Sequence, residues 1–181
     1  MRLFYAIEIP NKARNAIHGY LDRCGFYRSE NISFVKGDNL HITIMFLGEQ
    51  DPEKILQIDK IKMLAAEIIK APLEIYLEEF GAFVHRGGKQ RTFWIGVSDP
   101  SGTLQSLHAG VKEVMIEEKH IPKTKTKIFT PHITVGRSKR GTIDIKNFPP
   151  FPRTAFTISR LTLFSSSLKP SGAEYSIVKR Y

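Results

Sequence analysis

Short apolar runs and longer stretches of helical periodicity alternate along the chain. The short runs are rich in β-branched and aromatic residues, and they predict strands at residues 3–9, 32–35, 40–47, 73–84, 91–97, 129–137, 155–164 and 174–181. Apolar residues at helical spacing predict helices at 11–24, 51–71 and 99–115. Because strands and helices do not alternate one for one, we expect an α+β fold built from antiparallel sheets.

Capping and turn residues indicate where these elements begin and end. Asn11 is expected to cap the first helix and Asp51 the second. Pro52 suits the first helical position, and Glu53 places a negative charge near the positive end of the helix dipole. Turns are expected at 37–39, 85–90 and 169–172, with a stiff proline-rich connector at 148–152.

One four-residue pattern occurs in two of the predicted strands. His41-Ile42-Thr43-Ile44 returns as His132-Ile133-Thr134-Val135, 91 positions later (132 − 41). Side chains alternate between the faces of a strand, so in each copy the His and the Thr share one face. A single copy could arise by chance, but two copies with the same apolar positions favour a common function. We therefore expect the two strands to face each other across one cleft, in lobes related by an approximate twofold axis.

Two imidazoles and two hydroxyls in one cleft are suited to phosphoryl chemistry. Histidine titrates near neutrality, so one ring can serve as a general base while the other serves as an acid. A Thr hydroxyl can donate to a non-bridging phosphate oxygen and stabilise the charge that develops there. Arg137 is expected on the same face by alternation, where its guanidinium would clamp the phosphate.

The charge balance narrows the class of partner. Lys and Arg number 27 against 18 Asp and Glu, and the net charge of +9 attracts phosphate-rich molecules, although solubility alone would also account for it. Basic residues gather on both sides of the second motif, from Lys119 to Lys127 before it and from Arg137 to Arg140 after it. The run from Lys119 to Lys127 is explained equally well as a solvated loop and as a binding site.

Several classes of protein are excluded. The single cysteine, Cys24, rules out an internal disulfide framework and fits a reducing compartment. The apolar N-terminal stretch is too short to span a membrane and lacks the layout of a signal peptide, so we expect a cytoplasmic protein with no membrane partner. A zinc site at His41 and His132 would need a third ligand, and neither motif has a His-Glu-x-x-His arrangement or a nearby Cys or carboxylate. We expect no metal and no cofactor.

Other aromatic and histidine residues have a structural interpretation. We expect core positions for Phe46, Trp94 and Phe129, and a core or helix-end position for His108. His85 and His120 are expected in surface loops, with a contact to substrate as the alternative for both.

The paired motifs and their flanks resemble the two-histidine (2H) phosphoesterases, and among these the RNA 2′,3′-cyclic phosphodiesterases, also called 2′-5′ RNA ligases. The resemblance covers nearly the whole chain, through residues 2–10, 39–49, 80–83, 94–97, 130–137 and 163–168 with Gly172 and Tyr175. It implies a single domain over residues 1–181, with a bilobal fold in which two antiparallel sheets face a central cleft and helices cover the outer faces.

The resemblance also implies a reaction, the metal-independent hydrolysis of RNA 2′,3′-cyclic phosphate ends to 2′-phosphomonoesters. His41 would protonate the departing 3′ oxygen and His132 would activate water. Thr43 and Thr134 would bind the phosphate, with Arg137 as a helper. Related proteins often carry a basic residue at the position of Met45, so no phosphate contact is implied from it. The expected partner of this monomer is an RNA end with a cyclic phosphate, tRNA fragments among them.

Two further hypotheses stay open at this point. The same site could run 2′-5′ RNA ligation as the reverse reaction, or hydrolyse a small cyclic nucleotide or another 2′-linked phosphodiester. The third hypothesis belongs to another class, a non-catalytic RNA-binding module that uses the basic loop and the cleft.

Overall fold

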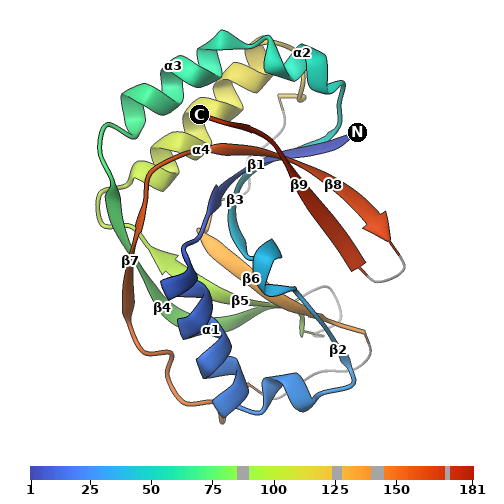
Figure 1. Ribbon diagram of the computed structural model, residues 1–181, viewed down its shortest axis with the longest axis vertical. Helices are drawn as coiled ribbons and strands as arrows, with labels where there is room; N and C mark the ends of the chain where they lie inside the picture. Colours follow the sequence, from blue (N-terminus) through green and yellow to red (C-terminus); the bar gives the residue numbers. More distant parts are fainter. Residues whose placement is uncertain (85–89, 124–127, 140–144, 170–171) are drawn as a thin grey trace.

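The structure is a computed structural model that describes residues 1–84, 90–123, 128–139, 145–169 and 172–181. Its strands are β1 (Arg2–Glu8), β2 (Ile32–Phe34), β3 (His41–Glu49), β4 (Leu73–Val84), β5 (Gln90–Ser98), β6 (His132–Ser138), β7 (Thr154–Ile158), β8 (Thr162–Lys169) and β9 (Gly172–Arg180). Its α-helices are α1 (Asn11–Arg23), α2 (Pro52–Leu56), α3 (Asp59–Ile68) and α4 (Thr103–Glu117). All the described strand pairs are antiparallel, which confirms the α+β fold (Figure 1).

The strands form one strongly curled sheet where two separate sheets were expected. Its order is β7-β4-β5-β6-β3-β1-β8-β9, and β2 pairs with β6. The halves β3-β1-β8-β9 and β6-β5-β4-β7 join at the two motif strands, and in the described residues their ladder is a single pair, Ile42 with Ile133. The sheet is therefore continuous, although only this one pair joins its two halves.

The order of the sheet supports the expected duplication. Outward from the centre, β3 is followed by β1 and β6 by β5. In the chain, β1 precedes α1 and then the first motif strand, while β5 precedes α4 and then the second motif strand. Each half of the centre is therefore built from the same strand-helix-strand unit.

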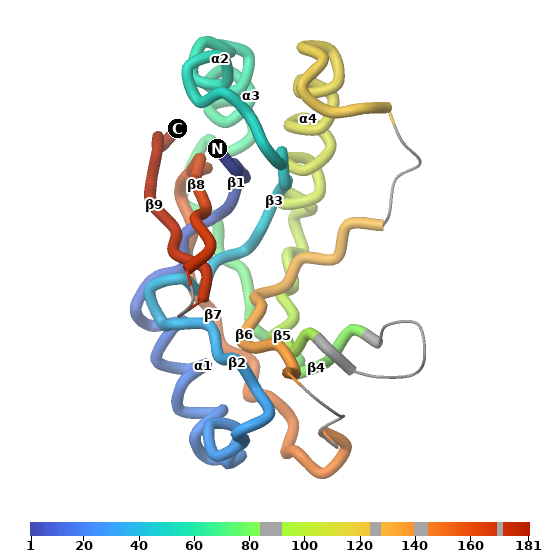
Figure 2. Tube along the Cα trace, turned by 90° about the vertical axis from the view of Figure 1, so that its right-hand side faces the viewer, coloured from blue at the N-terminus to red at the C-terminus, as the bar shows by residue number. Residues whose placement is uncertain are grey.

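Helices α1 and α4 each follow a strand in one half of the sheet and pack against the other half. Helix α1 follows β1, but its Tyr20 lies against Phe80 of β4 and Phe151, with ring centroids 5.7 and 4.8 Å away. Helix α4 follows β5, but His108 bonds to the backbone oxygen of Ile44 in β3 at 2.7 Å. Figures 1 and 2 show α1 at one end of the molecule and α2, α3 and α4 at the other. The crossing helices tie the two halves into one body.

The helix expected over residues 51–71 is two helices. Its start is as predicted, because Asp51 accepts a hydrogen bond from the backbone N–H of Glu53 at 3.1 Å. The break comes at Ile58, between α2 and α3. Ile55, Ile58 and Ile61 are all buried. In a straight α-helix each side chain points about 60° away from the one three positions earlier, so these three would turn away from a common face. The break between α2 and α3 keeps all three on the buried side.

The strand expected over residues 155–164 is also divided, and its parts lie on opposite sides of the sheet. Strand β7 pairs with β4, whereas β8 pairs with β1. At 159–161 the chain bends from β7 in one half of the sheet into β8 in the other (Figure 1). Both parts have strand-forming sequence, so the hydrophobic pattern alone could not reveal the crossing.

The predicted cap of the first helix was wrong. Asn11 is the first residue of α1 and not its cap, since Pro10 holds the cap position without a side-chain hydrogen bond. Much of the turn at 85–90, with His85, and part of the run from Lys119 to Lys127 lie outside the described residues. Among the helices described, none has the length and apolar character needed to cross a membrane.

Candidate active site

The five residues singled out in the sequence meet in one place. His41, Thr43, His132, Thr134 and Arg137 all line a single cleft of about 720 Å³. The first pair lies on β3, and the other three residues lie on β6. Together these five residues bring two imidazoles, two hydroxyls and one guanidinium to the cleft.

The register of the two motif strands explains how the cleft forms. Ile42 pairs with Ile133 in antiparallel orientation, so the neighbouring positions bring His41 toward Thr134 and Thr43 toward His132. Directly opposed side chains in a continuous antiparallel ladder lie about 5 Å apart at Cβ, which would leave no room for a ligand. Because this ladder is a single pair, the strands diverge and the polar side chains border an open space.

The same kind of hydrogen bond to a backbone carbonyl holds both histidines. Nδ1 of His41 lies 2.7 Å from the carbonyl oxygen of Asn39, and Nδ1 of His132 lies 2.7 Å from that of Thr130. A carbonyl oxygen can only accept, so each Nδ1 must carry the proton and donate it. In the neutral rings Nε2 is then the unprotonated nitrogen. Nε2 of His41 accepts a hydrogen bond from the hydroxyl of Thr43 at 2.9 Å.

These carbonyl partners could not be predicted from the sequence. Each one belongs to the residue two positions before the histidine, but any residue type supplies a carbonyl. At Asn39 the side chain adds a second restraint, because its amide donates to the backbone oxygen of Ala173 in β9 at 2.9 Å. The entrance to the first motif is therefore tied to the β8-β9 hairpin.

The rings that surround the two histidines differ. His41 lies between Phe4 and Tyr175, with centroid distances of 5.0 and 5.2 Å. His132 has the edge of Phe83 at 4.9 Å. The wall around His41 is built from β1 and β9, with Phe164 of β8 further away at 6.2 Å. The wall around His132 comes from β4 and from β5, whose Trp94 lies 6.5 Å away.

These surroundings lower the pKa of both rings. Burial lowers the pKa of His41 from its ordinary value to about 4, helped by the nearby His132 and Arg137 and opposed by the hydrogen bond to Asn39. Burial also lowers the pKa of His132, opposed by its bond to Thr130. Both imidazoles are therefore mainly neutral at pH 7 in the free protein.

Arg137 reaches the cleft through a bulge and not through simple alternation. It lies five positions beyond His132, so strict alternation would place it on the opposite face. A register shift between Phe93 and Trp94 leaves Val135 as an extra residue in β6. Such a bulge reverses the alternation beyond it. The prediction that Arg137 shares the face was correct, but the parity argument for it was wrong.

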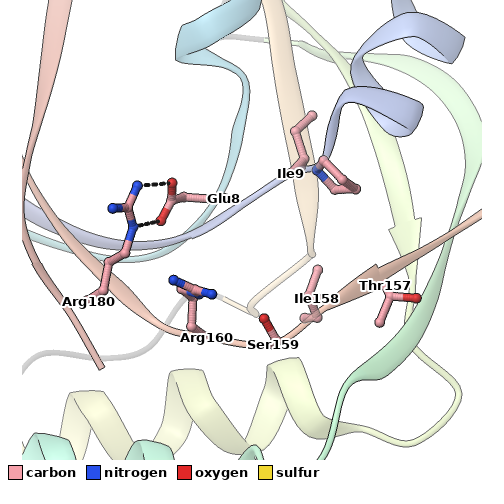
Figure 3. A pocket seen from close by; sticks show the side chains of 8 residues that line it. Glu8, Ile9, Thr157, Ile158, Ser159, Arg160 and Arg180 are labelled. Atoms are coloured by element: carbon pink, nitrogen blue, oxygen red, sulfur yellow. Dashed lines mark hydrogen bonds and ion pairs between the residues drawn. The ribbon is translucent and has the colours of Figure 1, made fainter.

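A second hollow, of about 280 Å³, lies where the link from β7 to β8 meets the start of α1 (Figure 3). Of its three charged residues, Glu8, Arg160 and Arg180, two are paired with each other, because Arg180 donates to both carboxylate oxygens of Glu8 at 2.8 and 2.9 Å. The hydrogen bond from Arg180 also lowers the pKa of Glu8. No motif residue lines this hollow, so the cleft remains the candidate site.

A family model described as the 2′-5′ RNA ligase superfamily matches residues 14–169. The chain belongs to this superfamily. It is 34% identical to an RNA 2′,3′-cyclic phosphodiesterase of Archaeoglobus fulgidus over 77% of this chain and 74% of the relative. It is 29% identical to a protein of the same name from Methanocaldococcus jannaschii over the full length of both. The crystal structure of Escherichia coli LigT complexed with 3′-AMP is similar, with a TM-score of 0.76 and 25% identity over 99% of this chain and 95% of that one.

In this member of the 2′-5′ RNA ligase superfamily, one end of the cleft is apolar. Phe46, His108 and Phe129 line it, although all three were expected in the core or, for His108, at a helix end. Phe46 is 65% exposed and Ile128 is 93% exposed. His108 stacks on Phe129 with centroids 4.3 Å apart and an interplanar angle of 2°. An apolar residue on a predicted strand or helix has the same pattern whether it faces the core or a cleft, so sequence could not separate the two.

His120 and Trp94 do not line the cleft. His120 bonds to the side chain of Gln50 at 3.1 Å and does not line the cleft, so the contact to substrate is not supported for it. Trp94 packs directly over Gly81, where any Cβ would collide with its ring. In the described ranges no three His, Cys, Asp or Glu side chains gather in a way that could hold a metal ion.

Proposed function

We propose that this protein hydrolyses 2′,3′-cyclic phosphates at RNA ends to 2′-phosphomonoesters, with an imidazole pair and no metal ion as catalyst. One observation carries the proposal: both histidines line one cleft with Nδ1 fixed on a carbonyl, which leaves each Nε2 available for proton transfer. The relatives named RNA 2′,3′-cyclic phosphodiesterase support the substrate class.

The two rings take opposite roles in this reaction. His132 removes a proton from water, and the water oxygen forms a bond to phosphorus as the bond from phosphorus to the 3′ oxygen breaks. His41 donates a proton to the departing 3′ oxygen, so the 2′ ester bond remains in the product. One water is consumed, and the two histidines regain their starting states by exchange with solvent.

Binding of substrate lets His41 take up from solvent the proton that it needs. The pKa of its ring is about 4 in the free protein, so it enters the reaction only if something raises that value. A phosphodiester anion next to the ring does so, because an opposite charge stabilises the imidazolium. Nε2 then becomes a donor and releases the hydroxyl of Thr43, which can turn toward a phosphate oxygen.

The other polar residues of the cleft bind the phosphate. The hydroxyls of Thr43 and Thr134 donate to its non-bridging oxygens, where negative charge grows in the transition state. The guanidinium of Arg137 adds a charge-assisted contact. In this proposal the enzyme acts as a monomer, with tRNA fragments among its candidate substrates.

The test is the position of the phosphate in the product. The protein is incubated in EDTA with an oligoribonucleotide that ends in a 2′,3′-cyclic phosphate, and the product is digested and analysed by chromatography against 2′- and 3′-phosphate standards. A 2′-phosphate is the expected product. A 3′-phosphate, or a loss of activity in EDTA that zinc or magnesium restores, would contradict the proposal. Tight RNA binding without any product would favour the non-catalytic RNA-binding module.

A further inference from the structure

The apolar end of the cleft continues into a second cavity along α4. This cavity measures about 570 Å³ and shares His108 and Phe129 with the cleft. Its other lining residues are Ala109, Lys112, Glu113, Ile116, Glu117 and Lys123. The two cavities therefore adjoin at these rings, and we call the second one the α4 groove.

The chemistry of the combined groove changes along its length. The motif end contains the imidazoles and hydroxyls that suit a phosphate. The stacked rings of His108 and Phe129 form the middle, and the α4 groove beyond them contains the amines of Lys112 and Lys123. A polar, an apolar and a cationic zone follow one another. Phosphate, nucleoside and phosphate alternate in the same order along an RNA strand.

The charges of the α4 groove leave the lysines available to a ligand. In the part of the chain that the structure describes, neither Lys112 nor Lys123 makes an ion pair with another side chain. Glu117 is already bonded to Lys60 of α3, at 3.0 Å. Glu113 is the remaining carboxylate, so cations outnumber unpaired anions in this groove.

The two rings of the middle zone are held in place. Nδ1 of His108 is engaged by the backbone oxygen of Ile44, which fixes the orientation of the ring. Its flat face is covered by Phe129, so these two rings form a rigid double layer at the junction. Flat, preorganised aromatic surfaces bind nucleobases without requiring a particular sequence.

Resting on the function proposed above, we propose that the α4 groove binds the nucleotide on the 5′ side of the reacting end. Lys112 and Lys123 contact the phosphate that joins it to the reacting nucleotide, and the base of the reacting nucleotide lies against the apolar surface beside Phe129. The enzyme then recognises an RNA end of at least two nucleotides and not only a terminal cyclic phosphate.

Kinetics on matched substrates test this inference. We compare kcat/KM for a mononucleoside 2′,3′-cyclic phosphate and for a dinucleotide that carries a 5′ phosphate and the same cyclic end. Wild type should prefer the dinucleotide by roughly tenfold or more, the range expected for added charge-assisted contacts. The double variant Lys112→Glu, Lys123→Glu should lose this preference and keep its rate on the mononucleotide.

A charge-matched control separates local contacts from the overall field. The variant Lys12→Glu, Lys62→Glu changes the net charge by the same amount at exposed positions on α1 and α3 that line neither cavity. It should keep the preference for the dinucleotide. Equal turnover of both substrates by wild type, or equal losses in the two double variants, would overturn the inference.

A binding measurement keeps this test independent of the proposed reaction. Fluorescence anisotropy compares a dinucleotide 3′-phosphate with a mononucleotide 3′-phosphate, neither of which can react. Tighter binding of the dinucleotide, lost in the groove variant, is expected even if no cyclic phosphate is opened. Absence of product with this binding pattern would reject the proposed function alone, whereas normal mononucleotide turnover without it would reject the α4 groove alone.

Discussion

His41 and His132 donate the same hydrogen bond from Nδ1 to a carbonyl two residues upstream, but different rings enclose them. The aromatic wall around His41 comes from the β1 and β9 side of the sheet, and the pKa of that ring falls to about 4. The wall around His132 contains Phe83 of β4. A duplicated motif therefore supplies two equivalent side chains. The unlike halves of the sheet surround them with different aromatic residues, and burial lowers the pKa of both rings.

This comparison teaches how one motif can serve two roles. The motif fixes what is common, namely the ring orientation and the tautomer. The surrounding strands set how easily each ring is charged, because burial disfavours the imidazolium. The asymmetry of the proposed acid and base thus belongs to the walls of the cleft, and it can be tested by changing the motifs and the walls separately.

The largest expected effect comes from removing either ring. His41→Ala and His132→Ala should each lower kcat on a cyclic phosphate end by about 10²- to 10⁴-fold, because each removes one of two proton transfers. His120→Gln is the matched control, since His120 does not line the cleft and should leave kcat near that of wild type. Near-normal activity in either alanine variant would show that the two rings do not act as a pair.

Loss of a hydroxyl should have a smaller effect on both sides of the cleft. Thr43→Val and Thr134→Val should each lower kcat by about 10²-fold, the cost of one donor aimed at developing charge. The serine variants retain a hydroxyl and should recover most of the rate. Steady-state kinetics of the four variants check this, and a valine variant that changes only KM would mean that its hydroxyl merely binds the ground state.

The pKa of His41 also makes stability depend on pH. The unfolded chain protonates this ring near its ordinary pKa of 6.5, but the folded protein does so only near 4. Between these values the unfolded state binds more protons, so acidification from pH 7 to 4 should lower the free energy of unfolding by about 3 kcal/mol through this ring.

Urea denaturation of wild type and His41→Gln at several pH values measures this contribution. The stability of wild type relative to the variant should be constant above pH 7 and decrease steadily toward pH 4. A difference between the two proteins that does not vary with pH would show that His41 has an ordinary pKa in the folded state.

The smallest expected effects come from the walls, and they test the comparison most directly. Tyr175→Ser should expose His41 and raise its pKa by about one unit, with little change at His132. Phe83→Ser should raise the pKa of His132 and leave the pKa of His41 nearly unchanged. Proton NMR titration of the two rings checks both, and equal shifts of both rings in each variant would contradict separate environments.

Local pattern was enough to predict many of the elements. The continuous apolar run of β1 and the capping residues at the start of α2 gave those elements their correct places. The spacing within β3 and β6 placed His41, Thr43, His132 and Thr134 on the faces that border the cleft. These features depend on side chains within a few positions of one another, which is the range over which strand and helix periodicity acts.

Other features depend on contacts between distant segments, and sequence could not supply them. The division of residues 155–164 between two sides of the sheet depends on pairing with β4 and β1. The placement of His108 and Phe129 in the cleft depends on the crossing of α4 onto β3. Neither arrangement can be predicted from the local hydrophobic pattern.

By itself the sequence determined that this chain has two equivalent histidine strands and the fold class that contains them. Only the tertiary structure decided that the two strands meet at the single pair Ile42 and Ile133 and that a bulge turns Arg137 into the cleft. It also decided that different aromatic residues surround the two imidazoles. The physical reason is that alternation is a property of one strand, whereas register, bulges and burial arise only when strands pack together.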